Sequence, residues 1–300
     1  MLVPDEIRDC VVFLGDVDDL GNERVRGTAF FVARPINLGS SHNLSFSYLV
    51  TARHVIDGMK KRKRQNVRVR INFRDGEARW IDTDIDSWVD HPAGPQVDIS
   101  VRRFLAEHSK INTKAWPLSS HISPERIERY EIGLGDEVFM AGLFSSHHGR
   151  LKNIPIIRIG NIAAMPEEPI KTNVHGVEME MEAYLIEARS IGGLSGSPVF
   201  LHMGWWRKLK DKPIATVESD FPFYLLGVMH GHWDLPVHHL DEITEDSPSL
   251  TPQRVNMGIA IVTPVSKLLE ALEVFEDAEI KETELIKEAI GLLPTADEAV

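Results

Sequence analysis

The 300-residue chain contains one cysteine, Cys10, so no intramolecular disulfide can form. This fits a reducing compartment or a fold that needs no covalent cross-links. Basic residues are the minority: 33 lysines and arginines stand against 45 aspartates and glutamates, a formal net charge of −12. Such an acidic chain is poorly suited to bind nucleic acid or an anionic membrane surface, so neither partner is expected.

Long apolar runs are also absent. No stretch approaches the length needed to cross a bilayer, and the first residues, MLVPDEIRDCVVFLGD, lack the basic start and long apolar core of a signal peptide. The sequence therefore predicts a cytoplasmic protein, and no cofactor is predicted.

Short apolar runs separated by turn residues dominate the chain, which is typical of an all-β barrel or sandwich. In the first half the expected strands are Cys10–Gly15, Gly27–Ala33, Ser47–Val50, Val67–Phe73, Arg79–Ile85 and Asp98–Phe104. In the second half they are Asp136–Gly142, Pro155–Ile162, Ala183–Arg189, Pro198–His202, Tyr224–His230 and Met257–Val262. Helical periodicity follows over Pro264–Phe275, and Glu279–Leu293 is a second candidate helix. Two polar regions, Trp205–Asp220 and Trp233–Asn256, are expected to be loops.

The most informative stretch is 193–198, which reads Gly-Leu-Ser-Gly-Ser-Pro. At ordinary residue abundances the pattern G-x-S-G-x-P arises by chance in under about 1 % of chains this long. A serine hydroxyl is a poor nucleophile until a base takes its proton, and the base must be held in one tautomer by a third group. The pattern therefore calls for a histidine and an aspartate elsewhere in the chain.

Both candidates lie upstream of Ser195. His54 ends the run Thr-Ala-Arg-His directly after an apolar strand, and Asp98 stands between Val97 and Ile99 at the start of another. An aspartate that enters an apolar strand needs polar partners if it is buried, and a histidine supplies one. Taken alone, such a histidine is more often structural, and such an aspartate is a weak signal.

The chain order His54, Asp98, Ser195 and these sequence contexts resemble the chymotrypsin/trypsin class of serine proteases. Subtilisins begin with the aspartate and α/β-hydrolases with the serine. The resemblance covers Val11 to Phe275, and it is closest in character to bacterial or intracellular members such as HtrA/DegP-type protease domains without a PDZ domain.

The resemblance implies a fold of two six-stranded antiparallel β-barrels with a C-terminal helix. It places an N-terminal barrel carrying His54 and Asp98 at residues 1–120 and a C-terminal barrel carrying Ser195 at 121–263. Residues 264–300 form C-terminal helices and an acidic tail in this scheme.

The resemblance also implies a role for each residue in a serine endopeptidase. Ser195 attacks the peptide carbonyl to form an acyl-enzyme, His54 acts as general base and then general acid, and Asp98 orients His54. The backbone N–H groups of Gly193 and Ser195 form the oxyanion hole. Secreted trypsins carry an aspartate directly before the nucleophile for zymogen activation; Leu194 stands there in this chain, so activation by N-terminal cleavage is not expected.

The resemblance also places four residues in or near the substrate groove: Arg189, Met229, His230 and Gly231. Arg189 would favour an acidic side chain before the scissile bond, or else it pairs with a neighbour such as Glu187. A polypeptide substrate is expected to bind extended against an exposed strand edge near 224–231.

Other interpretations remain open. The histidines at 230, 232, 238 and 239 suggest a metal site, although no cysteine or helical histidine pair supports one, and a polar loop explains them as well. Trp205 and Trp206 form either a partner patch or part of a core. The alternative function is a latent or inactive protease-fold module that binds peptides and is triggered by a regulatory partner. The sequence leaves the oligomeric state open.

Overall fold

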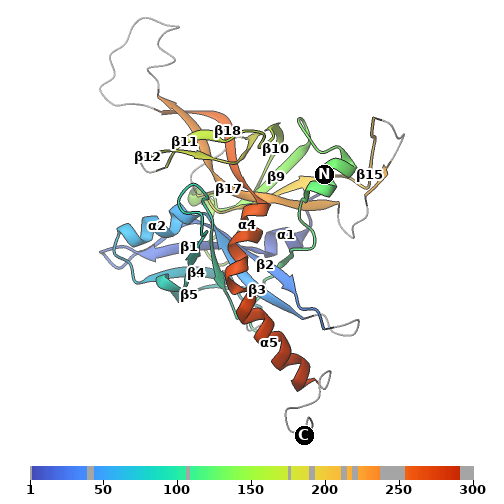
Figure 1. The fold of residues 1–300 in the computed structure, drawn as a ribbon. Helices are drawn as coiled ribbons and strands as arrows, with labels where there is room; N and C mark the ends of the chain where they lie inside the picture. Colours follow the sequence, from blue (N-terminus) through green and yellow to red (C-terminus); the bar gives the residue numbers. More distant parts are fainter. Residues whose placement is uncertain are drawn as a thin grey trace, which may run out of the picture.

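Two antiparallel sheets make up most of the molecule, and a pair of C-terminal helices runs from one to the other (Figure 1). The computed structural model describes residues 2–38, 44–105, 109–174, 177–188, 193–210, 215–217, 222–236 and 254–290. In this described part, no helix is both long and apolar enough to span a membrane.

The N-terminal sheet has eight strands in the order β5-β4-β1-β2-β3-β7-β6, with β8 pairing in parallel with β2. The strands are β1 (Val11–Val17), β2 (Glu23–Pro35), β3 (Ser45–Thr51), β4 (Asn66–Asn72), β5 (Ala78–Asp84), β6 (Val89–Asp90), β7 (Ser100–Arg103) and β8 (Trp116–Pro117). The helices α1 (Asp5–Asp9) and α2 (Arg53–Lys61) and the short 3-10 turn η1 (Ile85–Ser87) complete this half.

Both faces of this sheet are buried, because successive residues of a strand point to opposite sides. In β1, Phe13 packs in a core shared with the C-terminal half, while Val12 and Leu14 pack in a separate core with Ile56 of α2. Strands buried on both faces are nearly continuous apolar runs, which explains the uninterrupted pattern of segments such as Thr28–Val32.

The C-terminal sheet closes into a six-stranded barrel in the order β10-β13-β18-β17-β14-β9. Its strands are β9 (Glu137–Gly142), β10 (Ile156–Ala164), β13 (Tyr184–Glu187), β14 (Pro198–His202), β17 (Phe223–Pro236) and β18 (Arg254–Pro264). Two separate two-stranded sheets accompany it, β11 (Ile170–Val174) with β12 (Val177–Met181) and β15 (Trp206–Arg207) with β16 (Ala215–Thr216). The helix α3 (Pro124–Tyr130) precedes the barrel, and the 3-10 turn η2 (Ser145–His147) lies between β9 and β10.

The prediction of two six-stranded barrels is therefore confirmed for the C-terminal half and wrong for the N-terminal half. The C-terminal half is a closed barrel, but the N-terminal half is an open sheet. Its edge strand β6 has two residues and, within the described part of the chain, pairs only with β7. So short an edge offers too few backbone groups to close the sheet against β5.

The regions expected to be loops are also partly corrected. The segment 205–220 contains the short hairpin β15–β16. In the segment 233–256, β17 continues to Pro236 and β18 starts at Arg254, while residues 237–253, with His238 and His239, lie outside the described residues. Trp206 is 71 % exposed and Trp205 52 %, so the core interpretation of this pair is excluded.

The helical prediction at the C-terminal end is confirmed by α4 (Val265–Leu272), the 3-10 turn η4 (Glu273–Phe275) and α5 (Glu276–Ala289). In Figure 1 these red helices leave the orange strands of the barrel and cross the blue N-terminal sheet. Glu279 of α5 is buried there and accepts hydrogen bonds from Arg34 of β2 and Tyr48 of β3. The helices α4 and α5 therefore form a strap that joins the two halves, in addition to their shared core.

Candidate active site

The turn that carries Ser195 requires glycine on both sides. Gly193 and Gly196 have φ angles of +102° and +83°, in the left-handed region that favours glycine. A side chain on Gly196 would also lie 2.2 Å from the carbonyl oxygen of Thr28, too close for any atom. The pattern G-x-S-G is thus a conformational requirement of this turn.

Backbone hydrogen bonds to the barrel hold the turn closed. The N–H of Gly196 donates to the carbonyl of Met229 at 2.8 Å, and the N–H of Met229 donates to the carbonyl of Ser197 at 2.9 Å. Leu194 is fully buried in the shared core. In place of the charged residue of secreted trypsins, an apolar side chain anchors this turn.

Thr28, from β2 of the other half, clamps the same turn. Its N–H donates to the carbonyl of Ser195 at 2.9 Å and its hydroxyl to the carbonyl of Gly193 at 2.7 Å. The hydroxyl oxygen also accepts from the N–H of Leu143 at 2.9 Å. The sequence identified Thr28 only as part of a strand. The three hydrogen bonds described here join it to residues more than 100 positions away in the chain, and no local pattern predicts them.

Strand pairing brings His54 and Asp98 together. The ends of β3 and β7 pair with Thr51 opposite Ser100, so the residues just beyond these positions meet at one edge of the sheet. The Asp98 carboxylate accepts the backbone N–H of His54 at 2.8 Å through one oxygen and the His54 Nδ1 at 2.7 Å through the other. The predicted partnership of these two residues is present in the structure.

A second imidazole binds the same carboxylate. His230 of β17 places its Nδ1 2.5 Å from the Asp98 oxygen that also contacts His54. The His54 and His230 rings meet edge to face, with their centroids 5.4 Å apart. The hydroxyl of Ser195 donates to the backbone carbonyl of His230 at 3.1 Å, so the three predicted residues are connected through His230.

The electrostatics of the cluster favour an ionised aspartate beside a basic histidine. Burial by itself would raise the pKa of Asp98, but the charges of His54 and His230 and their hydrogen bonds hold that pKa well below its usual range. Burial by itself would lower the pKa of His54, but the charge and hydrogen bond of Asp98, with the charge of Asp57, raise it above 6.5. A carboxylate that stays ionised can orient His54 and stabilise its protonated form.

Among the described residues, the group that could hold a metal ion consists of His54, Asp98 and His230, whose ligand atoms lie within 4.8 Å of one another. Ligands around a tetrahedral zinc at about 2.0–2.1 Å are about 3.3 Å apart. The separations of 2.7 and 2.5 Å from Asp98 to the two imidazoles are shorter and match hydrogen bonds. The cluster is therefore arranged for direct hydrogen bonding.

The four residues expected in or near the substrate groove differ from one another in burial and in contacts. Met229 is fully buried, and its backbone supports the Ser195 turn. Gly231 is partly exposed in β17, and its contact with a substrate stays a prediction, while Arg189 lies outside the described residues. His230 is 8 % exposed, with its ring on Asp98; sequence reasoning placed it near the groove and missed this contact.

The strand expected to receive a substrate along its edge, β17, changes partners along its length. From Phe223 to Val228, β17 pairs with β14 on one side, and from Gly227 onward it pairs with β18 on the other. From Gly231 to Pro236, its pairing within the described part of the chain is with β18 alone. The segment 231–236 is thus a part of β17 with a strand partner on one side only, and the predicted substrate edge near 224–231 stays a prediction.

Two solved structures are similar to the chain over most of its length. One is the crystal structure of Deg5, with 14 % sequence identity, 88 % of each chain covered and a TM-score of 0.47. The other is the inactive form of a serine-to-alanine mutant of Rv3671c from M. tuberculosis H37Rv, with 16 % identity, 90 % of this chain and 89 % of that chain covered, and a TM-score of 0.44. Protein-family models and the sequences of curated proteins give no match.

Proposed function

We propose that the chain is a trypsin-like serine endopeptidase that hydrolyses peptide bonds through Ser195, His54 and Asp98. One observation carries the proposal: the carboxylate of Asp98 holds His54 by two hydrogen bonds, at 2.8 and 2.7 Å, beside a glycine-defined turn that presents Ser195. A serine, a base and an orienting carboxylate in one site are the parts that acyl transfer requires.

In the proposed reaction, the Ser195 oxygen attacks the substrate carbonyl while His54 Nε2 takes the hydroxyl proton. The tetrahedral intermediate collapses as the C–N bond breaks, and the imidazolium gives its proton to the leaving amine. Water then attacks the acyl-enzyme with His54 again as base, which releases the acid and restores the hydroxyl. Asp98 remains ionised throughout and stabilises the charge on His54.

The remaining parts of the proposal extend from this centre. The N–H groups of Gly193 and Ser195 would stabilise the oxyanion, a contribution of about 10²–10³-fold in rate per donor. The polypeptide would lie extended along 231–236, where β17 has an available edge. A cytoplasmic location belongs to the same proposal, supported by a single cysteine that is buried.

A fluorophosphonate probe tests the proposal because it reacts covalently with a serine activated by a base. We expect labelling of the wild type and none of Ser195→Ala. Ser197→Ala is a matched control, because this serine lies in the same turn, is fully buried and has no hydrogen-bond partner for its hydroxyl in the described structure. Labelling that persists in Ser195→Ala, or is absent from the wild type in every condition, would refute the free-standing enzyme.

A second candidate function is a latent effector, and the hydroxyl of Ser195 favours it. A hydroxyl has one proton, and here it is donated to the carbonyl of His230. In this arrangement the proton is not directed at a base, so the side chain must rotate before attack. A partner that induces this rotation would activate the site, and labelling seen only after addition of a cell extract would support this candidate.

A further inference from the structure

We propose that His230 is a positioning residue that ties the aspartate and histidine of one half of the molecule to the nucleophile of the other. The inference rests on the proposed function and deepens it. His54 and Asp98 belong to the N-terminal sheet, whereas Ser195 and His230 belong to the C-terminal barrel. The imidazole of His230 binds Asp98, and its backbone carbonyl binds the Ser195 hydroxyl.

An irregularity in β17 directs His230 toward Asp98. The pairing of β17 with β18 shifts register between Met229 and Gly231: Met229 lies opposite Val262 and Gly231 opposite Ile261. His230 is the extra residue of this bulge. Bulges re-aim side chains and are frequent next to active sites. Met229 fills the barrel core, and the next side chain turns out of the barrel onto the neighbouring half.

Within the described part of the chain, His230 is the one hydrogen-bond donor to the Asp98 carboxylate that does not belong to His54. One oxygen accepts the backbone N–H of His54 at 2.8 Å, and the other accepts the two imidazoles, at 2.7 and 2.5 Å. Without His230, the carboxylate would be held only by the residue that it must orient. The contact with a residue of the barrel therefore fixes the aspartate independently.

The hydrogen bonding also sets the protons. An ionised carboxylate is only an acceptor, so both histidines donate from Nδ1. In the neutral form of His54 the lone pair is then on Nε2, which is the tautomer that a general base for Ser195 needs. His230 thus acts through Asp98, and we expect its loss to reduce the reactivity of Ser195 without removing any group that touches the substrate carbonyl.

Two substitutions separate the hydrogen bond from the rest of the side chain. His230→Asn keeps an N–H donor at the same distance from the backbone, because the amide nitrogen and Nδ1 are both bonded to Cγ. His230→Leu removes the donor and keeps an apolar side chain of moderate size. His202→Leu is the control, since it makes the same change on β14 of the same barrel at a histidine that faces Glu137.

The first measurement is the rate of fluorophosphonate labelling. Loss of a buried hydrogen bond to a charged group predicts a rate about 10- to 100-fold lower for His230→Leu. We expect His230→Asn to stay within about 3-fold of the wild type, by the same reasoning on retained donors, and His202→Leu to match the wild type. Thermal unfolding of each variant establishes that the protein is folded.

The second measurement does not depend on activity. Nδ1 protons in short hydrogen bonds to a carboxylate give proton resonances far downfield. The wild type should show two, from His54 and His230. His230→Asn should lose one and keep that of His54, whereas in His230→Leu the His54 resonance should broaden through faster exchange with water.

These readouts distinguish failure of the inference from failure of the proposed function. If the wild type is labelled and His230→Leu is labelled equally fast with its His54 resonance intact, His230 has no positioning role and the protease proposal stands. If His230→Asn is as impaired as His230→Leu, the donor is not what matters and the inference is also overturned. If no labelling occurs at all, the protease proposal fails, and the His54 resonance in His230→Leu still decides whether His230 positions Asp98.

Discussion

At the scale of single residues, the proposed reaction makes the activation of Ser195 depend on the protonation of His54. His54 must be neutral at Nε2 to accept the hydroxyl proton. Burial lowers the pKa of His54, while the charge and hydrogen bond of Asp98 and the charge of Asp57 raise it, with a net increase above 6.5. The rate of fluorophosphonate labelling should therefore rise with pH, and the rising limb of this pH profile should have its midpoint above pH 6.5.

Asp98→Asn is predicted to change both the position and the height of this profile. Without the carboxylate, burial dominates, so the pKa of His54 should fall and the limb should move to lower pH. The plateau should fall by about 10³–10⁴-fold, because an amide does not secure the tautomer that the base needs. Labelling rates measured from pH 5 to 9, a range of about two pH units either side of 7, would check both effects.

Asp57→Asn provides the comparison for this prediction. Asp57 also raises the pKa of His54, but it forms its ion pair with Arg53 at 3.2 Å. Its substitution should move the limb slightly in the same direction and leave the plateau unchanged. A limb that stays in place in Asp98→Asn would mean that Asp98 does not control His54.

At the scale of elements, the Ser195 turn depends on a clamp from another sheet. Thr28→Val keeps the shape of the side chain but removes the donor to the Gly193 carbonyl and the acceptor for the Leu143 N–H. We expect the free energy of unfolding to fall by about 1–3 kcal/mol, the cost of unpaired buried polar groups. The labelling rate should fall as well, because the turn loses its link to β2.

Thr83→Val is the matched control for Thr28→Val. The buried hydroxyl of Thr83 likewise donates to a carbonyl, that of Val67 at 2.7 Å, and accepts from an N–H, that of Trp88 at 3.1 Å, but it lies away from Ser195. Urea unfolding should show similar losses of stability in the two variants, with slower labelling only in Thr28→Val. Equal labelling rates would show that the clamp does not affect the nucleophile.

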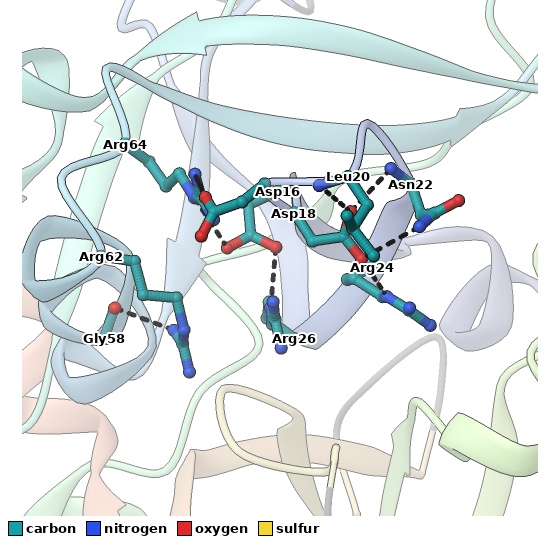
Figure 2. Close-up of polar contacts among 10 residues, drawn as sticks. Asp16, Asp18, Leu20, Asn22, Arg24, Arg26, Gly58, Arg62 and Arg64 are labelled. Atoms are coloured by element: carbon teal, nitrogen blue, oxygen red, sulfur yellow. Dashed lines mark hydrogen bonds and ion pairs between the residues drawn. The ribbon is translucent and has the colours of Figure 1, made fainter.

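The helix α2, which carries His54 in its first turn, is anchored by charges beyond its far end (Figure 2). Arg64 lies 3.5 Å from one Asp16 oxygen in β1, and Arg26 of β2 donates to the other at 2.7 Å. The carboxylate of Asp16 is 1 % exposed. The basic run at 60–64 therefore begins in α2 and ends in an ion pair with the buried carboxylate of Asp16.

Local patterns predicted the strands well because each strand is encoded by its own residues. All twelve expected strands overlap observed ones, since apolar runs and turn residues are local signals. The hairpin β11–β12 was missed although its alternation of glutamate and methionine at 177–181 was visible. Closure of a barrel is different: it depends on the lengths of edge strands such as β6, which no local pattern fixes.

The same distinction applies to the candidate site. The pairing of His54 with Asp98 could be predicted because chain order and sequence context mark both. The contact of His230 with Asp98 could not, because it arises from a one-residue register shift between β17 and β18. Such a shift decides which way a side chain points and leaves no mark in the composition of the strand.

At the scale of the whole molecule, the site lies between two halves, so its geometry depends on what holds them together. The strap α4–α5 begins in the barrel and ends on the N-terminal sheet (Figure 1). Its anchor is Glu279, 6 % exposed, which accepts from Arg34 at 2.6 Å and from the Tyr48 hydroxyl. Burial and the hydrogen bond to Glu279 raise the pKa of Tyr48, which stays protonated as a donor.

Glu279→Gln is predicted to weaken this strap. The substitution preserves shape but replaces a charged acceptor by a neutral amide, so hydrogen bonds worth about 1.5–3 kcal/mol each become weaker. We expect the urea midpoint of unfolding to fall.

Glu282→Gln is the control, because it changes the same residue type on the same helix, where Arg103 lies 2.6 Å away but the glutamate side chain is 41 % exposed. It should cost less than about 1 kcal/mol, as exposed pairs do. His54 belongs to the N-terminal sheet and Ser195 to the barrel, and the strap links the two. Fluorophosphonate labelling of Glu279→Gln should therefore also slow at denaturant concentrations below its unfolding transition. Labelling of Glu282→Gln should follow the wild type. Equal losses of stability in the two variants would show that Glu279 is not the anchor.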